Sequence, residues 1–287
     1  MRRYESESGE RWEGFEHRGG DIVISTRSKC GTTWMQQICA LLVFQDPELP
    51  APLSTISPWI DWPLRPVEEV FAQLGAQDHR RIIKTHTPLD GFALDHRATY
   101  VVVARNPLDV AVSYYHHVRN LDRRRVAEVL GRPVPEPEAM SLDEWLRRWV
   151  ADEEPIEVQL DTLSGNVHHV LDARSRQGVH DVVLVHYSDL EADLGGEVRK
   201  LAAHLGIAVP ESSWPALLQA AGFAAMAGRA ADRVPDGLGV LRDPAAFFRA
   251  GRSGDGVEAL PPELLPRYRA RLAQLAPPDV AAWLERS

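Results

Sequence analysis

The sequence predicts an α/β fold in which helices flank both faces of a P-loop-like central parallel sheet. Four short runs of residues are almost continuously apolar, as expected of strands that are buried on both faces. Stretches with helical character separate these runs, and an alternation of strands and helices is typical of a parallel sheet. The first run also leads through a tight turn into a helix, which is the structural context of a phosphate-binding loop.

The predicted elements follow one another along most of the chain. The first strand comes directly after Gly19 and Gly20, and the stretch WMQQICALLVF at residues 34–44 has the composition of the helix that should follow it. Each later strand precedes a plausible helix or a loop and helix. The predicted strands are residues 21–25 (DIVIS), 81–85 (RIIKT), 99–104 (TYVVVA) and 182–186 (VVLVH).

We expect residues 1–287 to form a single domain, since the length permits one large domain and no linker or internal repeat divides the chain. Residues 1–20 form a polar N-terminal segment. Residues from about 120 to 166 are rich in charge and are predicted to be a helical insertion. Residues 211–287 are rich in Gly, Ala and Pro, and we expect them to form a lid and a C-terminal helical part.

The composition excludes several classes of protein. No run of about 18 apolar residues is present, so we expect no stable membrane insertion, and the polar N-terminal segment predicts a cytoplasmic protein. The net charge of −9 and the pI near 5.7 argue against a nucleic-acid partner, although they permit a local basic pocket for a small anion. Two cysteines, Cys30 and Cys39, are too few for a structural zinc site.

Lysine is rare in this chain. Of the 32 basic residues only Lys29, Lys84 and Lys200 are lysines. Where arginine fills nearly every basic position, a remaining lysine indicates either chance or a need for a compact ammonium group. The sequence around each lysine must decide between the two.

The first lysine lies in a loop that resembles a phosphate loop but departs from the G-x-x-x-x-G-K-[ST] pattern, because the lysine precedes the glycine. Backbone N–H groups at the start of the following helix would point at an anion, and threonine hydroxyls would add donors. Trp34 could stack on a nucleotide base. The candidate residues of this loop are Lys29, Cys30, Gly31, Thr32, Thr33 and Trp34.

A second motif, KTHTP, lies at the carboxyl end of the second predicted strand. Lys84 and His86 are two residues apart and therefore share one face of the strand. In an open parallel sheet, ligands bind beyond the carboxyl ends of the strands. A histidine at this position can act as a general base.

The third motif, RNPLDVAVSYY, joins the third strand to a helix. Asn106 is a good N-cap and Pro107 suits the first helical position. Arg105 would then lie at the end of the strand, with Ser113 two turns into the helix, so that the two could bind a second anion. Pairing of Arg105 with Asp109 for stability is the alternative.

Together the three motifs resemble those of the cytosolic-type sulfotransferases, in consistent order from about Asp21 to Gly254. These enzymes transfer a sulfuryl group from 3′-phosphoadenosine 5′-phosphosulfate (PAPS) to an acceptor hydroxyl or amine and release adenosine 3′,5′-bisphosphate (PAP). The resemblance implies that the first loop binds the 5′-phosphosulfate of PAPS. Lys29 would then reach the bridging oxygen while the leaving phosphate gains charge.

The resemblance also implies roles for residues elsewhere in the chain. Arg105 and Ser113 would hold the 3′-phosphate, and Tyr187 in VHYSDL would hydrogen-bond the nucleotide. Phe223 in AGFAAM would sandwich adenine with Trp34. The late segment FFRAGRSGDG is similar to the family segment that closes over the 3′-phosphate, which implicates Arg249, Ala250 and Gly251.

This chain departs from the family pattern at several positions. Cys30 replaces a serine, Ala250 replaces a lysine and Gly256 replaces a tryptophan. We therefore predict that Arg252 supplies the cation lost at position 250, with a solvated Arg252 as the alternative. A recognisable C-terminal dimer motif is absent, so the sequence leaves the oligomeric state open.

The sequence thus predicts in-line sulfuryl transfer with His86 as the general base and with Lys29 and Lys84 stabilising the developing charge, without a metal. A P-loop kinase that uses ATP and Mg²⁺, and a silent PAPS or PAP sensor, are the alternatives.

We expect a lipid, glycolipid or phenolic acceptor. Trp59 and Trp62 could line its entrance or pack on the sheet, and His116 and His117 lack the nearby carboxylates of a metal site.

Overall fold

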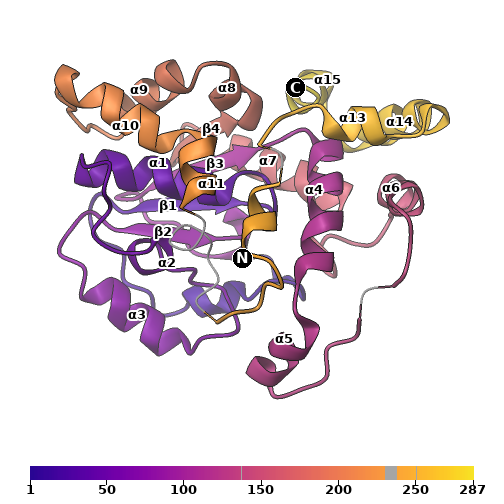
Figure 1. Cartoon of the computed structure of the whole chain (residues 1–287), viewed down its shortest axis with the longest axis horizontal. Helices are drawn as coiled ribbons and strands as arrows, with labels where there is room; N and C mark the ends of the chain where they lie inside the picture. Colours follow the sequence, from indigo (N-terminus) through magenta and orange to yellow (C-terminus); the bar gives the residue numbers. More distant parts are fainter. Residues whose placement is uncertain (137, 230–237, 250) are drawn as a thin grey trace.

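Four parallel strands in the order β2-β1-β3-β4 lie at the centre of the described residues (Figure 1). The structure is a computed structural model, and it describes residues 1–136, 138–229, 238–249 and 251–287. In register, Ile24 of β1 lies opposite Lys84 of β2 and Val101 of β3. The strands are β1 (Ile22–Thr26), β2 (Ile82–Thr85), β3 (Thr99–Ala104) and β4 (Asp181–His186). The predicted α/β fold with a parallel sheet is therefore confirmed, and each predicted strand lies within one residue of its observed bounds.

Both faces of the sheet are covered, which explains why its strands are apolar throughout. On one face, Ile22 and Ile24 pack with α1 (Thr32–Phe44) and with helices that follow β4. On the other face, Val23 packs with α3 (Val67–Gly75) and with Ala173 of α7 (Leu163–Arg176). Figure 1 shows the helices of residues 187–228 on the α1 side of the sheet and α3 on the opposite side.

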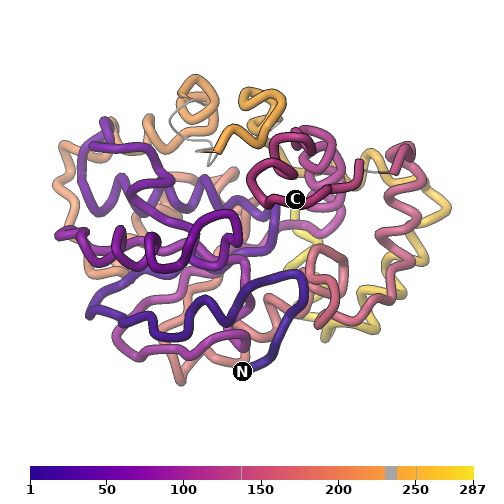
Figure 2. Tube along the Cα trace, turned by 90° about the horizontal axis from the view of Figure 1, so that it is seen from below, coloured from indigo at the N-terminus to yellow at the C-terminus, as the bar shows by residue number. Residues whose placement is uncertain are grey.

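The remaining helices form two groups beside these layers. The group near α1 consists of α2 (Leu53–Ile56), α8 (Tyr187–Ala192), α9 (Leu194–His204), α10 (Trp214–Ala221) and α11 (Phe223–Gly228). The second group consists of α4 (Pro107–Asn120), α5 (Arg123–Leu130), α6 (Leu142–Ala151), α7 (Leu163–Arg176), α13 (Asp255–Ala259), α14 (Leu265–Leu275) and α15 (Pro278–Leu284). In Figure 2 the yellow C-terminal helices run beside α6. No helix among the described residues is long and apolar enough to cross a membrane.

Helix α4 begins as the sequence predicts, and its first turn binds the backbone of the C-terminal part of the chain. The Asn106 side chain accepts a hydrogen bond from the Leu108 amide at 3.0 Å, and Pro107 occupies the first turn. The buried carboxylate of Asp109 accepts hydrogen bonds from the amides of Gly254 (3.0 Å) and Gly256 (2.7 Å). A Cβ atom at position 256 would lie 2.1 Å from the carbonyl carbon of Leu108, so this backbone contact accounts for the glycine in place of the family's tryptophan.

The N-terminal segment is polar in composition but packs firmly onto the sheet layer. Tyr4 and Trp12 are buried, and the Trp12 ring stacks on Phe92 with centroids 4.2 Å apart. Glu7 forms an ion pair with the buried guanidinium of Arg27, with 2.9 Å between the oxygen and nitrogen. The segment therefore contributes an acidic side chain to the interior beside Arg27, and burial raises the pKa of this Glu7 carboxyl to about 8.

Candidate active site

A cavity of about 430 Å³ lies at the carboxyl ends of the four strands. Residues that follow each strand line it: Lys29 after β1, His86 after β2, Arg105 after β3 and Tyr187 after β4. Parallel sheets bind ligands at this edge because the loops and helix N-termini converge there. The three sequence motifs thus meet in one site, as predicted.

The first loop has a backbone suited to an anion. Lys29 and Gly31 both adopt left-handed conformations, with φ of 66° and 104°. A non-glycine residue with positive φ is uncommon, and such turns direct successive N–H groups into one concave surface. Gly31 caps α1 without any side-chain hydrogen bond, so the first N–H groups of this 13-residue helix point at the cavity. A Cβ atom on Gly31 would lie 2.9 Å from the Tyr187 ring, which explains the glycine.

Two buried lysines in this cavity lack a carboxylate partner within the described residues. The Lys29 ammonium lies 4.1 Å from the centre of the Phe247 ring, and the Lys84 ammonium lies 3.7 Å from that of Trp59. Burial, with the positive charges of Arg105, Lys84 and Arg249, lowers the pKa of Lys29 to about 7, and burial lowers the pKa of Lys84 to about 8. Unpaired buried cations in a cleft indicate a binding site for an anion.

His86 is held in one tautomer. Its Nδ1 lies 2.6 Å from the carbonyl oxygen of Thr26, which can only accept, so Nδ1 carries the proton and Nε2 keeps a free lone pair. The ring meets Trp59 edge to face at 4.6 Å. Burial, together with the charges of Lys84 and Arg27, lowers the pKa of His86 well below its usual range. The imidazole is therefore neutral at pH 7 and can accept a proton at Nε2.

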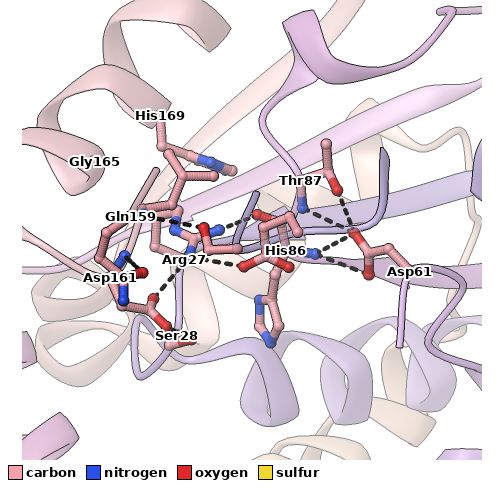
Figure 3. Close-up of polar contacts among 12 residues, drawn as sticks. Arg27, Ser28, Asp61, His86, Thr87, Gln159, Asp161, Gly165 and His169 are labelled. Carbon is pink, nitrogen blue, oxygen red and sulfur yellow. Dashed lines mark hydrogen bonds and ion pairs between the residues drawn. The ribbon is translucent and has the colours of Figure 1, made fainter. Parts of the chain in front are cut away.

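Two charged side chains fix the backbone of the KTHT segment from opposite sides (Figure 3). The Asp61 carboxylate accepts hydrogen bonds from the amides of His86 (3.1 Å) and Thr87 (2.9 Å) and from the hydroxyls of Thr85 and Thr87. Across the strand, Arg27 donates to the carbonyl oxygen of His86 and pairs with carboxylates of Glu7 and Asp161. The sequence analysis did not identify this network, since nothing in the local sequence marks its members.

We expect Asp61→Ala to lower the free energy of unfolding by at least about 2 kcal/mol, because it leaves several buried donors without an acceptor. Asp61 is 1% exposed, and both threonines that it binds are fully buried. Urea denaturation would measure the change. The control is Asp78→Ala, which removes an exposed aspartate. An equal urea midpoint for the two variants would contradict the role of Asp61.

The residues predicted to hold a nucleotide gather at the other end of the cavity. The Arg105 guanidinium lies over the Tyr187 ring at 4.3 Å, and the Trp34 ring meets Tyr187 at 5.0 Å. Trp34 is fixed by a 2.8 Å hydrogen bond from Nε1 to the carbonyl of Ala221. The alternative pairing of Arg105 with Asp109 is also present, at 3.9 Å. Lining residues at this end include Thr32, Thr33, Trp34, Ser113, Phe223 and Gly251.

The residues of the late segment FFRAGRSGDG differ in how they contact the cavity. Arg249 lines the cavity while pairing with Asp255, and a Cβ atom on Gly251 would lie 2.4 Å from the Phe223 ring. Ala250 lies outside the described residues. The guanidinium of Arg252 pairs with Asp255 (2.7 Å) and Glu258 (3.1 Å) and does not line the cavity. Arg252 instead meets the site through its carbonyl oxygen, which accepts a 2.8 Å hydrogen bond from Arg105.

Cys30 does not direct its side chain at the cavity. Its thiol faces the Asn166 side chain at 3.4 Å, and burial raises its pKa to about 12. Its backbone N–H group donates a 3.2 Å hydrogen bond to the carbonyl oxygen of Arg27.

The acceptor end of the cavity includes residues that the sequence analysis missed or left open. Trp59 and Trp62, which it considered for the entrance, stack at 5.4 Å and line the cavity beside His86. His117 also lines the cavity, and its spacing of four residues from Ser113 on one helix could have revealed it. The apolar lining that only the fold could reveal consists of Leu121, Val126, Leu130, Val240, Leu241, Phe247 and Phe248.

The chain is similar to known proteins over most of its length. The family described as Sulfotransferase domain matches residues 19–275. A glycolipid sulfotransferase of Mycobacterium bovis is 41% identical, over 95% of this chain and 90% of the relative, and one of Mycobacterium tuberculosis is 40% identical over the same shares. Sulfotransferase 1A1 of the dog is 27% identical over 88% of this chain and 82% of the relative.

Solved structures show the same fold at low sequence identity. Mouse sulfotransferase SULT7A1, solved in complex with PAP, aligns with a TM-score of 0.71 at 20% identity, covering 98% of this chain and 92% of its own. Retinol dehydratase, solved with androsterone and PAP, aligns with a TM-score of 0.70 at 20% identity, covering 92% of this chain and 84% of its own. From the family match over nearly the whole chain and the two mycobacterial relatives, the protein belongs to the sulfotransferase domain family and is a sulfotransferase.

Proposed function

We propose that this enzyme transfers the sulfuryl group of PAPS to a hydroxyl group of a glycolipid or related lipid-like acceptor in the cytoplasm. The observation that carries the proposal is the convergence of a neutral His86 with a free Nε2 and two unpaired lysines in one cavity. A base and fixed cations are what transfer of a sulfuryl group between two oxygens requires. The free thiols of Cys30 and Cys39 agree with a reducing compartment.

In this proposal the nucleotide occupies the end of the cavity near α1 and α4. The N-terminus of α1 and Lys29 bind the 5′-phosphosulfate, since N–H groups and an ammonium both favour anions there. Arg105 and Ser113 bind the 3′-phosphate, with Arg249 beside them. Trp34 and Phe223 contact adenine, and Tyr187 lies between the base and the phosphates.

The reaction follows from the positions of the remaining groups. His86 Nε2 takes the proton of the acceptor hydroxyl while its oxygen forms a bond to sulfur, and the bond from sulfur to the bridging phosphate oxygen breaks. Lys29 stabilises the negative charge that the leaving phosphate gains, and Lys84 stabilises the sulfuryl oxygens. Asp61 and Arg27 hold the His86 backbone fixed during this transfer. Fixed cations thus supply the charge that a kinase would draw partly from Mg²⁺.

The acceptor assignment is supported by the lining of the cavity beyond His86. Apolar side chains of α5 and the residues Val240 and Leu241 line the same cavity as the stacked pair Trp59 and Trp62. Such a lining suits an alkyl chain or a ring system. Relatives at 40% and 41% identity are named as glycolipid sulfotransferases, which favours a lipid that carries a sugar over a phenol.

The test is an acceptor panel with radiolabelled PAPS that contains glycolipids, simple lipids with one hydroxyl, and phenols. We expect transfer to a hydroxylated lipid with release of PAP, unaffected by EDTA. Transfer from ATP instead, or dependence on a divalent metal, would contradict the proposal and favour the kinase alternative. PAP binding without transfer to any member of the panel would contradict the acceptor class.

We further expect the affinity for PAP to fall as the pH rises above about 7. Burial and neighbouring positive charges lower the pKa of unliganded Lys29 to about 7, whereas a bound phosphate favours the ammonium form. Below this pH the lysine is already charged, so binding takes up no proton. Above it, binding must draw a proton from solvent, and the affinity declines by up to about tenfold per pH unit.

Calorimetry of PAP binding in buffers of different ionisation enthalpy would measure the proton uptake directly. Lys29→Met is the control, since it removes the titrating group and should flatten the pH dependence. A wild-type affinity that is constant between about pH 6.5 and pH 8.5 would contradict the assignment of Lys29 to a phosphate.

A further inference from the structure

His117 is a second histidine in the cavity that contains His86. It is one helical turn beyond Ser113 on α4, and both side chains line the cavity. The His117 ring meets the Phe247 ring edge to face with centroids 6.1 Å apart, and the same Phe247 ring lies 4.1 Å from the Lys29 ammonium. His117 therefore shares one cavity with Lys29 and His86, and a ligand in that cavity can contact it.

The imidazole of His117 is poorly satisfied by the protein. Its side chain is half-buried, yet within the described residues its ring nitrogens form no hydrogen bond. Burial, together with the charges of Lys29 and Lys84, lowers the pKa of His117 to about 3, so the ring is neutral and offers one donor and one acceptor. A hydroxyl group, which both donates and accepts, is the matching partner.

Besides the cations Lys29, Lys84 and Arg123 that act on its ring, His117 shares the cavity with several apolar side chains. Leu121 lies one turn further along the chain, and Val126 and Leu130 of α5 line the same end of the cavity. An acceptor with a single hydroxyl would present that hydroxyl to His86 and press apolar surface against His117. The ring nitrogens of His117 would then lose their hydrogen bonds to water without gaining a partner. A site discriminates strongly against a ligand that leaves its buried polar groups unpaired.

We propose that His117 is a specificity-determining residue that hydrogen-bonds a second hydroxyl of the acceptor, and that the acceptor's reacting part is a polyhydroxylated ring attached to an apolar chain. This inference rests on the proposed function and sharpens it. In this proposal His117 is the residue that distinguishes a lipid that carries a sugar from a phenol or a sterol, because only the sugar offers a second hydroxyl. The reacting hydroxyl lies at His86, the second hydroxyl at His117, and the chain along the apolar side chains of α5.

Binding of two probes with the same chain to the PAP complex tests this inference. Octyl β-glucoside carries a polyhydroxylated ring, and 4-octylphenol carries a ring with one hydroxyl. We expect His117→Phe to weaken binding of the glucoside by about tenfold, because the variant removes the hydrogen bond but keeps a ring. Binding of the phenol should stay unchanged or become tighter. His117→Gln, which restores a donor and an acceptor, should recover part of the loss. His116→Phe, on the exposed side of α4, is the control.

Tryptophan fluorescence provides the binding signal, since Trp59 and Trp62 line the cavity. Thermal stabilisation by PAP in every variant shows that the nucleotide end is intact. Equal weakening of both probes, no weakening of either, or failure of the wild-type protein to bind the glucoside would each overturn the inference. If the glucoside binds through His117 but receives no sulfuryl group from PAPS, the binding role of His117 stands, whereas the polyhydroxylated ring is not the reacting part and the proposed acceptor class fails.

Discussion

His86→Ala is expected to lower turnover by roughly 10²–10⁴-fold while leaving the affinity for PAP nearly unchanged, because it removes a general base and no phosphate contact. The base is Nε2, since Nδ1 donates to the carbonyl of Thr26. Single-turnover transfer from PAPS would measure the chemical step, and calorimetry would measure PAP affinity. A variant that keeps more than about a tenth of wild-type turnover would remove His86 from this role.

Two further measurements separate a base from a structural histidine. His116→Ala, on the exposed side of α4, should leave turnover within a factor of about two, since it contributes no group to the cavity. Burial and the charges of Lys84 and Arg27 keep the pKa of His86 below its usual range. Wild-type activity should therefore persist as the pH falls below about 6.5 and decline only when His86 takes up a proton. An acidic limb above about pH 7 would indicate a different base.

The fold and the strand-end motifs could be predicted because local sequence determines them. Buried strands need apolar residues on both faces, as in Thr99–Ala104, and the N-cap at Asn106 is a property of adjacent residues. Lys84 and His86 share a face by the geometry of any strand. Their meeting with Lys29 follows once the strands are parallel, because the carboxyl ends of parallel strands lie at one edge.

The supporting network and the acceptor end could not be predicted, because their members are far apart in the chain. Asp61 reaches His86 across 25 positions, and the Arg27 pair with Asp161 spans 134. A buried aspartate and an exposed one look alike in a sequence. The sequence analysis also did not identify Asp255 and Glu258 as partners of the Arg252 guanidinium, and the role of Arg252 in place of the cation that Ala250 lacks stays a prediction.

Lys29→Met should lower the rate of sulfuryl transfer by about 10²-fold or more, the usual cost of removing one electrostatic stabiliser from a buried site. The ammonium lies over Phe247 with no carboxylate partner in the described residues, so its charge is free to act on a ligand. Methionine retains most of the side-chain length and is apolar, so the variant should fold normally in surroundings that already disfavour a charge. Single-turnover transfer from PAPS at about pH 6.5, where the wild-type lysine is charged, would measure the effect.

A control variant at Lys200 and a comparison of donors with different leaving groups make the Lys29→Met test specific. Lys200→Met is the matched control, because Lys200 is 74% exposed and pairs with Glu197, and it should leave the rate unchanged. If Lys29 stabilises the leaving phosphate, its loss should slow transfer from a donor with a poor leaving group more than transfer from a donor with a good one. A rate for Lys29→Met close to that of wild type with a poor leaving group would reject the assignment. An equal loss with both donors would place Lys29 in binding rather than in the transition state.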